Sequence, residues 1–253
     1  MSSNTPDSLL WQGLRPEARD LLEMRNYSAS PLLAQLSGSG LPISALLRKD
    51  DFFEAWIPGV EIVPRTVYQQ PGRGYFAEFV RQHEGVPAKL SYWPQQWATA
   101  TMFAGSVKGF HIHPPSIPAD FAPEAWFRRL FVEEPENMAL RSYAKEQWDL
   151  MFFTRGICEM ILVDERAGLE RRIMRFRIDG DNRPGPNNAG VVIPPGVAHA
   201  LRCMSSEDLV MVYGTSTPFD PKYEGRIGSA VENSILPEDW QAYLSGKMTS
   251  QVL

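Results

Sequence analysis

The chain has 253 residues, of which 43% are hydrophobic, and a formal net charge of −5, so it can form one sizeable core plus an appendage. Nucleic-acid binding requires clustered Lys and Arg, and this charge balance argues against it. No apolar run approaches the roughly 18 residues of a membrane span, and the start MSSNTPDSLLWQ lacks the features of a signal peptide. We therefore expect a cytoplasmic protein without a membrane partner.

Residues 1–55 are predicted to form an α-helical arm. The segment Pro16–Arg25 has proline near a helix start and apolar residues at helical intervals, and Ser30–Leu36 begins another short helix before Gly38-Ser-Gly40. We expect the arm to pack over the main domain or over a neighbouring subunit rather than to take part in catalysis.

From about residue 60 onward, short apolar runs are separated by Gly, Pro and Asn, as in an antiparallel β domain. This domain is predicted to span residues 56–228, followed by a C-terminal tail at 229–253. A hairpin turn is expected at Arg155-Gly156. The clearest strands are Met160–Val163, Ile173–Ile178, Val191–Ile193 and Leu209–Tyr213.

Three of the four histidines lie in two spaced motifs. Gly105–His113 reads Gly-x5-His-x-His, and Pro194–His199 ends in Pro-x-Gly-x2-His. Side chains alternate along a strand, so His111 and His113 point to one side and can converge inside a barrel. The two motifs look like the signatures of the cupin superfamily, which implies a mostly β jelly-roll barrel, also called a double-stranded β-helix. His83, outside the motifs, is predicted to have no functional role.

Cupins usually add a glutamate ligand before a turn glycine, and here Asp149 stands in that place ahead of Gly156. Imidazole nitrogens with one carboxylate suit a divalent transition metal such as Fe, Mn, Ni or Zn better than Ca or Mg. We therefore predict a metal site formed by His111, His113, Asp149 and His199. The alternative is that these are ordinary core or surface residues.

Residues 114–148 interrupt the barrel pattern as a helical insertion. Ala122–Phe131 is predicted to be an amphipathic helix started by proline. Because both ends of the insertion adjoin proposed ligands, we expect a lid or substrate wall over the barrel mouth, with a subunit contact as the alternative.

The two cysteines, Cys158 and Cys203, lie in apolar strand-like runs. Their number excludes a disulfide framework and their spacing matches no metal or redox motif, so buried free thiols are expected.

Over roughly residues 60–228 the chain also resembles the dTDP-4-dehydrorhamnose 3,5-epimerase family. Arg73–Glu78 is similar to the family's Arg-Gly-x-Phe-x-Glu segment, and Lys108–His111 is similar to its Arg-Gly-Leu-His. Further matches, in the family's order, are Ile193–His199, Val212–Thr215 and Asp220–Glu224.

The resemblance implies a homodimer that acts on a nucleotide-linked keto-sugar without metal. It implies that His111 is the base, that Tyr213 delivers a proton on the other face, and that Lys108 stabilises the enolate. Arg73 and Glu78, with Gln96, would bind the substrate. Leu209, Met211 and Tyr213 share one strand face, so Tyr213 would enter the barrel if that face is the interior.

Departures from the family leave the reaction open. His113 stands where the family has glutamine, Asp149 lies near the family's lysine, and Leu244–Met248 lacks the acidic partner of the base. The first hypothesis is a metal-assisted isomerase or epimerase, in which His111 is either base or ligand. The second is a metal-dependent cupin oxygenase, and the third is a non-catalytic sugar-binding module.

Overall fold

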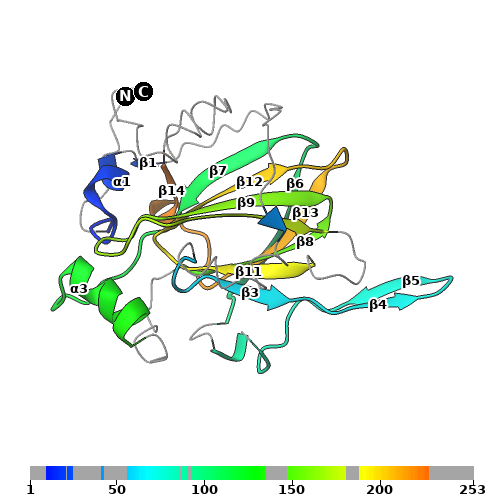
Figure 1. The fold of residues 1–253 in the computed structure, drawn as a ribbon, viewed down its shortest axis with the longest axis horizontal. Coiled ribbons are helices and arrows are strands. Elements are labelled where there is room, and N and C mark those ends of the chain that lie inside the picture. The colour runs from blue at the N-terminus through cyan, green and yellow to red at the C-terminus, as the bar shows by residue number, and fades with distance from the viewer. Residues whose placement is uncertain are drawn as a thin grey trace.

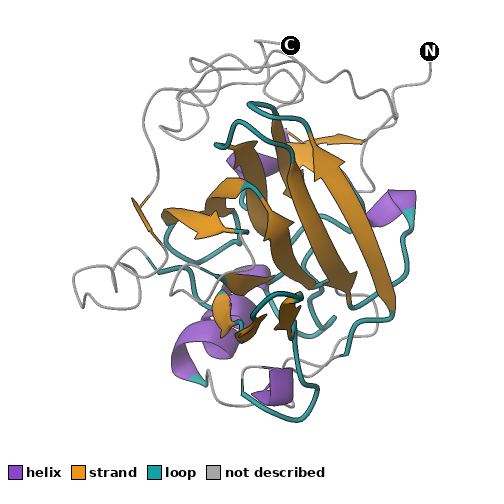
Figure 2. Ribbon diagram, turned by 90° about the vertical axis from the view of Figure 1, so that its right-hand side faces the viewer, coloured by secondary structure: helices purple, strands orange, loops and turns teal. Residues whose placement is uncertain are grey.

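The computed structural model describes residues 10–20, 22–24, 41–42, 56–85, 87–89, 93–134, 147–180 and 188–227. In this part of the chain two β-sheets form two layers, and the helices lie around their edges and outer surfaces (Figures 1 and 2). The prediction of a mostly β, jelly-roll-like protein is confirmed.

The first sheet has seven strands. Neighbouring strands within this sheet run antiparallel, except that β2 and β10 run parallel to each other. In spatial order the strands are β1 (Leu22–Met24), β14 (Gly225–Ile227), β7 (Val107–Ile112), β12 (Val197–Cys203), β9 (Ile157–Asp164), β10 (Ile173–Asp179) and β2 (Leu41–Pro42).

The second sheet has five strands, all in antiparallel pairs. In spatial order they are β3 (Glu61–Pro64), β11 (Ala189–Ile193), β8 (Asp149–Arg155), β13 (Leu209–Thr215) and β6 (Gln96–Met102). The four strands predicted most clearly from the sequence all lie within observed strands.

Alternation along the strands separates an inner from an outer face. On β8, Met151 and Phe153 join the core between the sheets, whereas Leu150 and Phe152 belong to a second apolar cluster outside. Cys158 and Cys203 face each other across β9 and β12 in the inner core as buried free thiols, as predicted.

The expected hairpin at Arg155-Gly156 is wrong. β8 and β9, which flank this turn, belong to different sheets, so the chain here crosses from one layer to the other. Gly156 has a φ of 77°, and a Cβ atom there would lie 2.8 Å from Ser205 Oγ. Glycine is therefore favoured at position 156 for two reasons: a side chain would collide with Ser205, and the positive φ is easily adopted only by glycine.

The described part of the N-terminal arm packs on the outer face of the seven-stranded sheet. Trp11, Leu14 and Leu22 share a buried cluster with Phe110 and Ile161. The helix α1 (Pro16–Asp20) is shorter than predicted, since Leu22–Met24 forms β1 against β14.

Two other predictions lie outside the described residues, namely the helix at Ser30–Leu36 and the tail at 229–253. The division of the chain into domains stays a prediction.

The insertion contains the expected helix, α3 (Pro123–Arg128), which continues into a π-helical turn, η3 (Arg129–Glu133). Trp126, Phe127 and Leu130 are buried with Leu150 and Phe152. These helical side chains therefore cover the outside of the five-stranded sheet. The prediction that this helix lies over the barrel mouth is wrong. Residues 135–146 of the insertion lie outside the described residues.

A separate two-stranded hairpin, β4 (Val67–Gln70) and β5 (Gly74–Ala77), projects from the barrel (Figure 1). Short 3-10 turns occur at η2 (Pro87–Lys89) and η5 (Pro221–Tyr223). Within the described ranges, no helix is both long and apolar enough to cross a membrane.

Candidate metal and proton-transfer site

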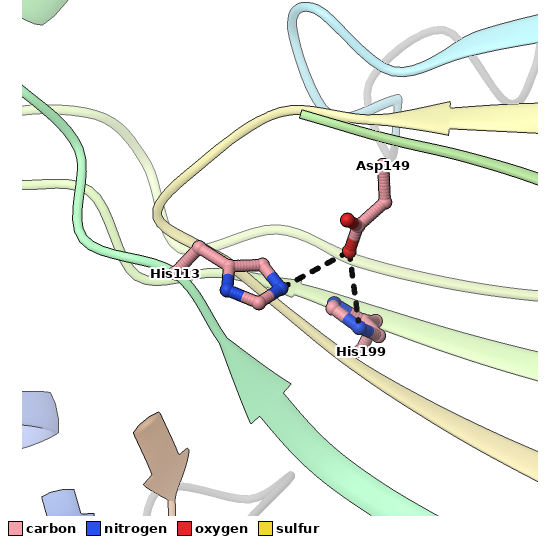
Figure 3. Close-up of side chains that lie close together, drawn as sticks. All are labelled: His113, Asp149 and His199. Carbon is pink, nitrogen blue, oxygen red and sulfur yellow. Dashed lines mark hydrogen bonds and ion pairs between the residues drawn. The ribbon is translucent and has the colours of Figure 1, made fainter. Parts of the chain in front are cut away.

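Three predicted ligands converge between the two sheets (Figure 3). His113 directly follows β7, Asp149 begins β8, and His199 lies on β12. Asp149 Oδ2 is 3.1 Å from His113 Nε2 and 3.6 Å from His199 Nε2. All three side chains are buried. Among the described residues, these three form the only group of His, Cys, Asp and Glu side chains close enough to share an ion.

Both histidines turn the same nitrogen toward Asp149. His113 Nδ1 lies 3.1 Å from the carbonyl oxygen of Tyr223, and His199 Nδ1 lies 3.4 Å from that of Val197. A carbonyl oxygen only accepts hydrogen bonds, so each Nδ1 carries a proton. In the neutral ring the Nε2 lone pair then points into the site, which is the arrangement that backbone carbonyls give to metal-binding histidines.

Charge and burial shift all three pKa values. Burial alone would lower the pKa of His113, but the negative charges of Asp149 and Glu224 raise it to about 9. Burial lowers the pKa of His199 to about 4, because Asp149 offsets only part of the desolvation cost. Burial alone would raise the pKa of Asp149, yet His113 holds it below its usual range. Protonation of His199 beside a protonated His113 is thus disfavoured.

The donor set fits a divalent transition metal. Ligand atoms around one ion at about 2.0–2.2 Å lie roughly 3–3.5 Å from each other, close to the separations found between Asp149 and the two histidines. Two imidazole nitrogens with a carboxylate oxygen are typical of Fe, Mn, Ni or Zn sites rather than Ca or Mg sites.

His111 lies outside this group. It stands opposite His199 on the neighbouring strand, and the two rings stack with their centroids 5.6 Å apart. Its Nδ1 contacts the guanidinium of Arg226 on β14, which is 2% exposed. A guanidinium only donates hydrogen bonds, so Nδ1 is the acceptor and the proton of the neutral ring lies on Nε2.

Tyr213 faces the barrel interior, as its strand position predicted. It packs against the inner core that contains Leu209 and Met211. On the paired strands β13 and β8, Thr215 is opposite Asp149 and Tyr213 is opposite Met151. Tyr213 is therefore a diagonal neighbour of Asp149, a relationship that places residues about 7–8 Å apart.

The predicted substrate-binding residues occupy two regions. Lys108 on β7 is opposite the core residue Leu201 and so is directed inward, while Gln96 Oε1 accepts a 2.9 Å hydrogen bond from the Phe219 amide. Arg73 lies exposed in the turn of the β4–β5 hairpin. Glu78, which follows the hairpin, pairs with Arg81 at 2.9 Å.

Sequence reasoning missed Gln147 and Arg226. The Gln147 carboxamide is buried against both His113 and Asp149. Its sequence signal is weak: it lies two residues before Asp149, and β8 begins only at Asp149. Arg226 had no signal, because its contact with His111 joins residues far apart in the chain.

No family model matches the chain. The chain is 26% identical to the spore coat polysaccharide biosynthesis protein SpsL of Bacillus subtilis (strain 168) over 166 residues, which cover 65% of this chain and 83% of that protein.

Two solved structures illustrate the structural likeness. The RmlC epimerase of Mycobacterium tuberculosis matches with a TM-score of 0.50 and 15% identity over 78% of this chain and 94% of its own. The dTDP-4-dehydrorhamnose 3,5-epimerase of Bacillus anthracis matches with a TM-score of 0.47 and 13% identity over 66% and 77%. The match to the Mycobacterium tuberculosis enzyme confirms the fold, and with it the resemblance to this epimerase family at the level of the fold.

Proposed function

We propose that the protein is an epimerase that moves a proton at a carbon next to the carbonyl of a keto-sugar, with nucleotide-linked sugars as its substrate class. The observation that carries this proposal is that His111 on β7 and Tyr213 on β13 both face the space between the sheets. Each sheet thus offers one proton-handling group to the same interior. The shared fold with a sugar epimerase and the similarity to a polysaccharide biosynthesis protein support the substrate class.

In this proposal the Tyr213 hydroxyl delivers a proton to one face of the sugar carbon, a water molecule in the site takes up the proton that leaves the opposite face, and exchange with solvent restores both groups. His111 donates a hydrogen bond from Nε2 to the carbonyl oxygen, because its contact with Arg226 leaves the proton there. This role differs from that of the base, which the family resemblance implies for His111. The inward-facing Lys108 stabilises the negative charge that develops on the enolate oxygen.

A divalent transition metal held by His113, Asp149 and His199 is part of the proposal. When bound, the ion would supply Lewis-acid stabilisation of negative charge on the substrate oxygen. The chain's own contribution is to direct two Nε2 lone pairs and one carboxylate to one point, and to bury that point away from water.

We further propose a homodimer in which the β4–β5 hairpin contacts a second copy. Tyr68, Tyr75 and Phe76 are each about half exposed on this hairpin, at 51%, 51% and 52%. An isolated two-stranded hairpin is marginally stable in water, and its exposed aromatic side chains favour a contact with another protein surface, here a second copy of the chain. Arg73 and Glu78 would bind substrate from this hairpin region.

The test is incubation of the full-length protein with a dTDP-linked 4-keto sugar in D₂O, with deuterium followed by mass spectrometry and NMR. Deuterium should enter at one or both carbons next to the carbonyl. No exchange, with sugar binding intact, would contradict the epimerase proposal and favour the non-catalytic module.

One observation favours a second candidate. Two histidines and one carboxylate are the ligand set of non-haem Fe(II) oxygenases. Substrate-dependent oxygen uptake by the iron-loaded protein, without deuterium exchange, would select this function instead.

A further inference from the structure

The carboxamide of Gln147 contacts two of the three residues of the candidate metal site, His113 and Asp149. Its Nε2 is 3.1 Å from His113 Nε2 and 3.2 Å from Asp149 Oδ1, and its Oε1 accepts a hydrogen bond from Thr217 Oγ1 at 3.2 Å. Gln147 is only 4% exposed, so water does not replace these partners. The three short contacts fix the amide between the two proposed ligands and a hydroxyl group.

With Asp149 ionised, no arrangement of protons on His113 and Gln147 satisfies all of these contacts. If His113 is neutral, the lone pair of its Nε2 faces the Asp149 carboxylate at 3.1 Å. If the ring is protonated, its Nε2–H pairs with Asp149 but faces the Gln147 nitrogen, which is also a donor. Turning the amide over relieves that contact and sets Oε1 against Asp149 Oδ1. In a buried site, a donor that faces another donor, or an acceptor that faces another acceptor, costs free energy because neither group forms a hydrogen bond.

A cation at this point removes the conflict. His113 Nε2, His199 Nε2 and Asp149 can all direct electron pairs to it. With the amide of Gln147 turned over, Oε1 also faces the ion and Nε2 donates to Thr217 Oγ1, which accepts as readily as it donates. The two ends of a carboxamide have nearly the same size, so the turn needs no repacking.

We propose that Gln147, through Oε1, is the fourth protein ligand of a divalent transition metal held by His113, Asp149 and His199, in the position that the sequence assigned to His111. The inference rests on the metal part of the proposed function. His111 is excluded from coordination because its Nδ1 contacts Arg226 and its Nε2 carries the proton. An amide oxygen beside two imidazoles and a carboxylate gives a site with net charge +1 when a divalent ion is bound, which suits Fe, Mn, Co, Ni or Zn.

The experiment titrates Co²⁺ into the chelator-treated full-length protein and its variants, using calorimetry for affinity and visible absorption for coordination. Gln147→Leu removes the ligand oxygen at similar volume and should weaken binding by about 10-fold or more, the loss typical of removing even a supporting group. Gln147→Glu keeps an oxygen donor and should bind at least as tightly as wild type. His111→Asn is the matched control, and its Co²⁺ affinity should stay within about two-fold of wild type.

Equal affinity of wild type and folded Gln147→Leu overturns the inference, as does a loss of affinity in His111→Asn equal to that expected for Gln147→Leu. If Gln147→Leu does not fold, Gln147→Asn replaces it. Asparagine keeps the amide but is one methylene shorter, so it should also weaken binding, and unchanged affinity overturns the proposal.

Deuterium exchange in the wild type separates this inference from the proposed reaction. Exchange by a protein that binds no Co²⁺ refutes the ligand role and leaves the epimerase standing. Co²⁺ binding with the expected variant pattern, but without exchange, supports the ligand role and refutes the epimerase.

Discussion

The rings of His111 and His199 stack 5.6 Å apart on adjacent strands, yet only His199 directs Nε2 toward Asp149. His111 instead contacts Arg226 on β14, on the other side of β7. The strand β7 and the residue after it thus supply two inward histidines with different surroundings. This difference makes metal binding and proton transfer separable by mutation.

We predict that the protein binds one divalent transition metal per chain and that His113→Ala abolishes tight binding, because the variant loses a nitrogen ligand expected at about 2.0–2.2 Å from the ion. Metal content of protein purified without chelator is the measurement. His83→Ala, at an exposed histidine, is the control and should keep its metal. A metal-free wild type, with His113→Ala unchanged in stability, would contradict the site.

Tyr213→Phe is expected to lower the rate of deuterium exchange by about 10²–10⁴-fold, because it removes the hydroxyl that transfers the proton. The fold and the metal content should not change, since Tyr213 is outside the ligand group. Single-turnover exchange in D₂O measures the effect. An unchanged rate would refute the catalytic role of Tyr213.

The stability of the metal-free protein should depend on pH through His113. Its pKa is about 9 in the folded protein against 6.5 for an ordinary histidine, so the folded state binds this proton more tightly. The resulting stabilisation is fully present below about pH 6.5 and is lost as the pH rises through about 9.

Urea unfolding of chelator-treated wild type and His113→Gln tests this at pH values from about 6 to 10. The difference in unfolding free energy between the two proteins should shrink as the pH rises. A difference independent of pH would show that His113 is not protonated in the folded state.

Leu130→Ala should lower the free energy of unfolding by about 2–5 kcal/mol, because Leu130 is fully buried between η3 and the outer face of the five-stranded sheet. Co²⁺ affinity should not change. Val132→Ala, at a neighbouring side chain that is 57% exposed, should have an effect within about 0.5 kcal/mol. If Leu130→Ala changes metal affinity but not stability, the helix contacts the site and not the outer surface.

Replacing Tyr75 and Phe76 together by serine should convert the proposed dimer to a monomer, because it removes the aromatic surface of the β4–β5 hairpin. Sedimentation velocity measures the change. The control is Phe103→Ser, since Phe103 is similarly exposed at 57% but follows β6. A wild-type monomer, or a double variant that stays dimeric, would contradict this contact.

The sequence by itself predicted four of the strands and the shared faces of His111 with His113 and of Tyr213 with Leu209 and Met211. Alternation of side chains along a strand follows from local backbone geometry, so spacing alone predicts which residues share a face. The apolar runs in β9, β10, β11 and β13 were long enough to show this pattern, and the motif spacing pointed to the barrel interior.

Only the tertiary structure decided which inward residues meet. His111 and His113 are equivalent by alternation, and the distant Arg226 separates their roles. The layer crossing at Gly156 and the packing of α3 outside the barrel likewise depend on which strands and surfaces lie opposite each other. Gln147 joins the site because its carboxamide packs between side chains from both sheets. Such contacts arise from non-local packing, which local periodicity does not encode.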